Sequence, residues 1–228
     1  NNDIYTINKG NNTQIIDFKS KDNTFSIDSK TQKSLTDDYI ANLYNYQKPK
    51  YNAFSGLPTL GFNPDDGLKF GINVNYTVNH FNQNPYTHKH ILKANYYFAT
   101  GGFELLYNLQ VPKIVGQWNF DLASQITSPN FAINYFGNGN NTVNEQETKV
   151  MDYNRVRIRI LKAEPQLKKI GLYGSTVVLK TSFESYDVEK TMNRFIALPG
   201  QVSPAVFDSQ QFAGATIRYS YENYDNPS

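Results

Sequence analysis

Residues 68–80 alternate between apolar and polar side chains, and this pattern constrains the fold more than any other feature of the sequence. A period of two places all the apolar side chains on one face of a β-strand. At about 3.3 Å per residue the segment extends about 43 Å, or about 33 Å in height when tilted by about 40°. Strands of soluble proteins are commonly about 5–6 residues long, so this length is typical of a strand that crosses a membrane. The apolar positions are Leu68, Phe70, Ile72, Val74, Tyr76 and Val78.

Seven further segments have one apolar face, and many carry aromatic residues near their ends. The chain contains 17 Tyr and 15 Phe, which favour strands and the aromatic girdles of membrane barrels. The sequence therefore predicts an all-β protein, an antiparallel transmembrane β-barrel with about eight strands between residues 53 and 228. The expected strands lie near residues 53–63, 68–80, 88–98, 103–111, 117–127, 153–163, 171–186 and 211–222.

Composition excludes several other classes of protein. No apolar run approaches about 18 residues, so we expect no transmembrane helix. The net charge of +2 gives no basic field for nucleic acid, and the absence of Cys excludes thiol catalysis and disulfides. Three His residues leave little material for a metal centre or a catalytic triad, and we expect no cofactor and no metal in this chain.

Residues 1–52 differ from the rest of the chain in being mostly polar. We expect residues 1–34 to form an extended linker. Within 35–47, Leu35, Tyr39, Ile40 and Leu43 recur at helical spacing, which predicts a short amphipathic helix that ends before Pro49.

The connections between the predicted strands differ in length. The second, fourth and sixth (81–87, 112–116 and 164–170) are short, whereas the fifth and seventh (128–152 and 187–210) are long. In bacterial barrels the periplasmic turns are short, so we expect the N-terminus in the periplasm. Residues 224–228 form a turn-like run that follows the last strand, and no terminal strand ending in an aromatic residue follows it. We therefore expect an incomplete barrel.

Several short motifs resemble those of a known family. They are Asp37–Tyr44, the run Gly61–Gly71 around Asn63-Pro64-Asp65-Asp66-Gly67, Tyr97–Phe103, Asn134–Asn140 and Tyr221–Pro227. Together they are similar to the bacterial surface antigen barrels of the BamA superfamily, and within it to Bacteroidetes proteins in which a calcineurin-like metallophosphoesterase precedes the barrel.

The resemblance implies a barrel of about sixteen strands, of which about eight lie in this chain. It implies a bacterial outer-membrane protein that anchors an attached periplasmic domain or assists the assembly or export of other proteins. Its partners would be outer-membrane lipid, the barrel-assembly machinery and other outer-membrane or periplasmic proteins. The chain has none of the His and Asp clusters of a metallophosphoesterase, so any such enzyme would lie outside this sequence.

Three arginines at alternate positions are the sharpest candidate site. Arg155, Arg157 and Arg159 alternate with apolar residues, and we expect their side chains on the polar face of one strand, toward the lumen. Like charges about 7 Å apart repel and need partners. The candidate lumenal acids are Glu104, Asp121 and Glu184. The main interpretation is a salt-bridge network in the wall, and the alternative is an anion-selective pore or a ligand contact.

Two further groups of residues have weaker signals. The long fifth connection contains a Gly- and Asn-rich stretch, which we interpret as a folded capping loop or a surface-recognition loop. His88 and His90 lie on one strand face, but with no third ligand in view they are more simply polar side chains at a strand end. The loop residues are Asn134, Phe136, Gly137, Gly139 and Asn140.

Two other classes of protein are compatible with the alternation. A complete eight-stranded barrel would bind a ligand or close around a packed interior. A soluble, glycan-binding β-sandwich would pack the Leu68–Val78 face against a second sheet.

Overall fold

The computed structural model describes residues 2–11, 13–42, 50–63, 67–80, 83–139, 149–150 and 152–222. The chain is mostly β and contains a large antiparallel sheet, which confirms the all-β antiparallel prediction. It divides into two compact units, one of Asn1–Asn52 with Thr77–Thr87 and one of Ala53–Tyr76 with His88–Ser228. Within the described ranges, no helix has the length and apolar character needed to cross a membrane.

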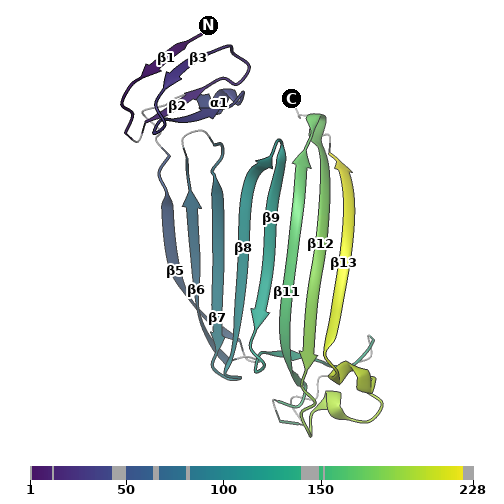
Figure 1. Ribbon diagram of the computed structural model, residues 1–228. Helices are drawn as coiled ribbons and strands as arrows, with labels where there is room; N and C mark the ends of the chain where they lie inside the picture. The colour runs from purple at the N-terminus through teal and green to yellow at the C-terminus, as the bar shows by residue number, and fades with distance from the viewer. Residues whose placement is uncertain are drawn as a thin grey trace, which may run out of the picture. The chain divides into compact units, whose positions relative to one another are not determined.

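The larger unit is built on one antiparallel sheet in which long strands pair with their neighbours along the chain (Figure 1). The strand order is β13-β12-β11-β9-β8-β7-β6-β5, and the short β10 pairs with β11. The strands are β5 (Ala53–Asn63), β6 (Gly67–Val78), β7 (His88–Tyr97), β8 (Gly102–Val115), β9 (Trp118–Thr127), β10 (Ala132–Asn134), β11 (Arg155–Ile170), β12 (Ser175–Val188) and β13 (Gln210–Tyr221).

All eight predicted strand ranges coincide with strands, but two predicted connections were wrong. Residues 164–170 continue β11, because Ala163, Pro165 and Leu167 still alternate with polar residues; all three pair with β9, and Ala163 and Leu167 also pair with β12. Residues 112–115 continue β8 through a register shift between Val111 and Val115. The hairpin after β8 is therefore only the Gly116-Gln117 turn.

The sheet is open. In the described chain β5 and β13 are the two edge strands and do not pair with each other, so no barrel is closed. The alternative of a complete eight-stranded barrel expects this pairing, and it is not found.

The connections after β7, β9 and β12 lie at one end of the sheet, which we call the loop end (Figure 1). Two 3-10 helices, η2 (Phe195–Ala197) and η3 (Pro204–Phe207), lie in the connection after β12. The ring of Phe195 lies 5.9 Å from the rings of both Tyr135 and Tyr153, so this connection packs against the one after β9. The opposite, turn end has the Gly116-Gln117 turn and η1 (Leu172–Gly174).

The N-terminal unit contains four short strands where a linker was expected. β1 (Ile4–Ile7) pairs in parallel with β3 (Thr24–Ile27), and β2 (Gln14–Asp17) pairs in parallel with β4 (Gln32–Leu35). Each strand thus pairs with the strand after next, as in two successive coils of a solenoid. The repeat is visible in the sequence, where Tyr-Thr-Ile-Asn at 5–8 corresponds to Phe-Ser-Ile-Asp at 25–28.

Contacts between the two coils hold the repeat in register. The rings of Tyr5 and Phe25 stack with centroids 5.3 Å apart, and the Tyr5 hydroxyl donates to Asp17 at 2.7 Å. The Gly10 amide donates to Asp28 at 2.8 Å, and a Cβ at Gly10 would lie 2.1 Å from the Thr31 hydroxyl. Gly10 is therefore required for the close approach of the coils. The predicted helix is seen as one turn, α1 (Tyr39–Asn42), and residues 43–47 of that prediction lie outside the described residues.

Candidate functional site

The register assigns the side chains of β7–β13 to two opposite faces. Ile126 lies opposite both Leu105 and Leu161, which defines an apolar face. Lys162 lies opposite both Gln125 and Glu184, which defines a polar face. The apolar face includes Leu92, Ala94, Tyr96, Phe103, Leu105, Tyr107, Leu109, Trp118, Phe120, Leu122, Ile126, Leu161, Ala163, Leu167, Val177, Leu179, Phe183, Ala213, Ala215, Ile217 and Tyr219.

The apolar face is exposed across the sheet. Phe70 on β6 is 51% exposed, Phe183 on β12 is 58% exposed, and Ile217 on β13 is 81% exposed. In the described part of the chain, no second sheet covers the apolar positions of β6, contrary to the β-sandwich alternative. Soluble monomers rarely expose contiguous apolar patches larger than a few hundred Å².

The apolar face approaches the height of a membrane band. From Trp118 to Ile126 on β9 it extends eight residue steps, or about 26 Å along the strand at about 3.3 Å per residue and about 20 Å in height when tilted by about 40°. The apolar band of outer-membrane barrels is about 25 Å tall. Aromatic residues lie at both borders, with Trp118 near the turn end and the edge-to-face pair of Tyr96 and Phe98 near the loop end.

The polar face carries a hydrogen-bonded network. Glu104 accepts hydrogen bonds from Gln125 at 2.9 Å, Tyr97 at 3.2 Å and Asn95 at 3.3 Å. The donors belong to β7 and β9 and Glu104 itself to β8, so one carboxylate joins three adjacent strands.

Ion pairs continue this network across β11 and β12. Lys180 lies 2.5 Å from Glu164, and Lys162 lies 3.4 Å from both Glu164 and Glu184. Tyr186 donates to Glu184 at 2.5 Å. Two cations and two carboxylates thus alternate on half-buried positions, where each compensates the desolvation of its neighbours.

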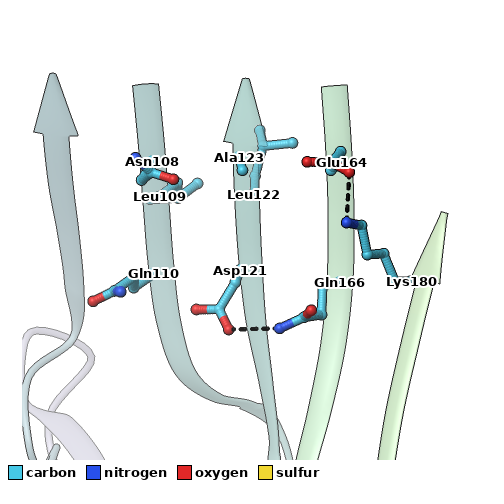
Figure 2. A pocket seen from close by; sticks show the side chains of 9 residues that line it. All are labelled: Asn108, Leu109, Gln110, Asp121, Leu122, Ala123, Glu164, Gln166 and Lys180. Atoms are coloured by element: carbon cyan, nitrogen blue, oxygen red, sulfur yellow. Dashed lines mark hydrogen bonds and ion pairs between the residues drawn. The ribbon is translucent and has the colours of Figure 1, made fainter. Parts of the chain in front are cut away.

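A shallow hollow of about 120 Å³ opens on the polar face between β8, β9, β11 and β12 (Figure 2). Gln166 donates to Asp121 at 3.4 Å on one side of it, and the Lys180–Glu164 pair lies on the other. Asn108 and Gln110 line it from β8. Amide and carboxylate groups of this kind can exchange hydrogen bonds with water or with hydroxyl groups.

The three arginines lie on the face opposite to the one predicted. β11 pairs with β12 without a register break from Ile158 to Ala163, so Arg159 shares the face of Leu161, and Val156 and Ile158 share the face of Lys162. The polar side chains of β11 are at odd-numbered positions up to Arg159 and at even-numbered positions from Lys162. The face of β11 that carries apolar side chains within the apolar band therefore carries the arginines beyond it.

None of the arginines pairs with the predicted acids. Arg155 pairs with Asp152 at 2.7 Å, Arg157 with Glu189 at 3.5 Å, and Arg159 with Asp187 at 4.0 Å. The predicted acids Glu104, Asp121 and Glu184 all lie on the polar face instead, within the contacts described above. The sequence signal for these contacts is the even-numbered run of Lys162, Glu164, Gln166 and Lys168, most of which falls in the predicted connection 164–170.

Arg155 belongs to the packed loop end. It is 5% exposed, and its carbonyl accepts a hydrogen bond from Arg194 at 2.9 Å. Asn154 is 2% exposed and donates to the carbonyl of Tyr135 at 3.1 Å. These contacts join the connections after β9 and β12, so Arg155 stabilises the loop end of the sheet.

The remaining residues that the sequence singled out lie in turns or contact neighbouring side chains of the sheet. Asn134 ends β10 opposite Arg155, and Gly137 and Gly139 have φ values of 103° and 101°, as expected of glycines in turns. Phe136 follows in the same connection, and Asn140 lies outside the described residues. His90 shares a 2.8 Å hydrogen bond with Tyr107, and the ring of His88 lies 5.0 Å from that of His90. Among the described residues, no group of three or more His, Asp or Glu side chains is arranged to hold a metal ion.

Comparison of the chain with protein-family models, with curated proteins and with solved structures found no match. The functional interpretation therefore depends on the two faces of the sheet and on the contacts described above.

Proposed function

We propose that the sheet forms part of the wall of an outer-membrane β-barrel, with the apolar face toward lipid and the polar face toward the lumen. The observation that supports this function is the exposed apolar face, about 26 Å long along the strands, opposite a face rich in hydrogen bonds and ion pairs. Lipid would contact the apolar face, and water or lumenal groups would form hydrogen bonds with the polar face.

Closure of the wall requires strands along the free edges of β5 and β13. Unpaired backbone groups in a bilayer cost several kcal/mol each, so an open sheet cannot be the membrane-bound form. We propose that further strands complete a barrel of about sixteen strands, the arrangement implied by the resemblance to the BamA superfamily.

Within this proposal the chain anchors and does not catalyse. The barrel would hold an attached periplasmic domain, with a phosphoesterase as the example that the resemblance suggests, or assist the assembly or export of other outer-membrane proteins. The barrel-assembly machinery would insert it, and the N-terminal unit would lie in the periplasm.

The single tryptophan provides a direct test. Trp118 lies on the apolar face and its neighbour Asn119 on the polar face. The protein with its complete barrel, in which any tryptophan outside residues 1–228 is replaced by Phe, would be reconstituted into bilayers that contain lipids with brominated acyl chains, which quench tryptophan on contact. We expect strong quenching of Trp118 and weak quenching by aqueous iodide.

The matched control moves the indole by one residue. In a Trp118→Phe, Asn119→Trp variant the fluorophore lies on the polar face, and we expect iodide to quench it and brominated lipid to leave it bright. Equal lipid quenching of both proteins, or none of either, contradicts the assignment of the two faces.

A further inference from the structure

A groove lies on the apolar face along β11, β12 and β13. Its part nearer the loop end has a volume of about 520 Å³ and is lined by Leu161, Ala163, Phe183 and Ala213, among others. The adjoining part has a volume of about 400 Å³, and its floor is formed by Pro165, Thr181 and Ala215 between larger side chains. Small residues on the three strands thus leave two adjoining hollows among the larger side chains of Leu161, Phe183, Phe120, Leu167, Leu179 and Ile217.

The groove has the dimensions of one acyl chain. From Leu161 to Leu167 it follows β11 for six residue steps, or about 20 Å at about 3.3 Å per residue. One leaflet contributes about half of the roughly 30 Å hydrocarbon core. A single chain of a membrane lipid, aligned with the strands, therefore fits the groove along its length.

Cationic side chains lie at the loop end of this groove. Arg159 and Arg157 follow Leu161 on the same face of β11, beyond the border of the apolar band. The side chains of Arg159 and Arg157 are 58% and 36% exposed. Their contacts with Asp187 at 4.0 Å and Glu189 at 3.5 Å are too long for strong ion pairs.

We propose that the groove and these two arginines form a binding site for a phosphate-bearing membrane lipid. One acyl chain lies in the groove, and the headgroup phosphate accepts hydrogen bonds from Arg159 and Arg157. Guanidinium groups match phosphate oxygens with two parallel N–H donors, which favours arginine at such a site. The site rests on the proposed position of the sheet in a membrane.

The two acidic neighbours set the strength of the site. Asp187 and Glu189 compete with a phosphate for the guanidinium groups and repel the headgroup. Removal of one acid should therefore strengthen lipid binding, whereas a purely structural ion pair would only lose stability.

The experiment uses one fluorophore beside the site. In a Trp118→Phe background, Ile126→Trp places the only indole opposite Leu161, outside the groove. The full chain is reconstituted into phosphatidylcholine bilayers with a small fraction of brominated phosphatidylglycerol or of brominated phosphatidylcholine. We expect brominated phosphatidylglycerol to reach the same quenching at a mole fraction about fivefold lower than that of brominated phosphatidylcholine. This is the factor that one basic side chain at a membrane surface contributes.

Variants test whether the preference for phosphatidylglycerol over phosphatidylcholine comes from this site. The double substitution Arg157→Gln, Arg159→Gln should abolish that preference. Ala163→Phe should weaken the preference by filling the groove, and Asp187→Asn should increase it. Arg218→Gln, which removes a cation from the polar face, should leave it unchanged. Equal quenching by the two lipids, or a preference that survives the double Gln substitution, overturns the site while the membrane proposal stands. No quenching by either lipid overturns both.

Discussion

At the scale of single residues, Ile160 marks the position at which β11 exchanges the roles of its faces. Before it, Arg157 and Arg159 are on the apolar face, and after it Lys162 and Glu164 are on the polar face. The sequence predicts a period of two correctly up to residue 163 but not over residues 164–170, which were expected to form a connection. It does not predict which face a charge occupies, because that depends on where the strand leaves the apolar band.

Tyr5 provides a pH-dependent prediction for the N-terminal unit. Its hydrogen bond to Asp17, with burial and the Asp17 charge, raises the pKa of Tyr5 from 10.0 to about 12. The folded unit therefore favours the protonated phenol, and this stabilisation is fully present below pH 10 and lost as the pH rises through about 12. Ring-labelled NMR titration, with Tyr5→Phe for assignment, should show this late transition.

Asp17→Asn is the control for this titration, because it removes the charge and weakens the acceptor. The pKa of Tyr5 should then move back toward its ordinary value. A titration of Tyr5 that is the same in the wild type and in Asp17→Asn would show that the hydrogen bond is not the cause.

At the scale of elements, strict alternation of apolar and polar residues predicted the strands well. The predicted ends of the strands were wrong where that alternation is interrupted. β5 agrees with its predicted range, and β6 differs by at most two residues at either end. Pro165 lies inside β11, where it pairs with Leu122 of β9 but has no partner in the ladder with β12, as expected of a residue without an N–H donor. The strands of the N-terminal unit were not predicted because they are only four residues long, and their repeat is the feature that reveals them.

The two faces of β6 predict opposite tolerance to charge. Val74→Arg places a guanidinium on the apolar face and should destabilise the membrane-inserted form by about 2–4 kcal/mol, whereas Asn75→Arg on the polar face should be mild. Urea unfolding from lipid vesicles would compare the two variants with the wild type. Similar stability of the two variants would mean that the apolar face of β6 does not contact lipid.

At the scale of the whole molecule, the open sheet requires partners for two long edge strands. β13 pairs with β12 over twelve residues and presents its other edge unpaired, and β5 does the same at the opposite side of the sheet. Neither edge is shortened, so the described sheet is suited to continue in both directions.

A closed barrel made from this sheet should resist detergent until it is heated. We expect an antibody against residues 128–152 to detect, in purified outer membranes, a band whose mobility changes on boiling. Its mass should exceed 26.0 kDa several-fold if further strands and domains are fused to this chain. A single band at 26.0 kDa would contradict the larger barrel and favour a small binding barrel or a secreted β protein.

The parallel pairing in the N-terminal unit makes its length adjustable. Because β1 pairs with β3 and β2 with β4, a tandem copy of one coil would find the same hydrogen-bonding partners as the coil before it. Each duplication would extend the unit by the spacing of neighbouring strands, about 4.8 Å, without altering the coils already present. Gene duplication could therefore lengthen this unit in small equal increments, which a segment made of unrelated loops does not allow.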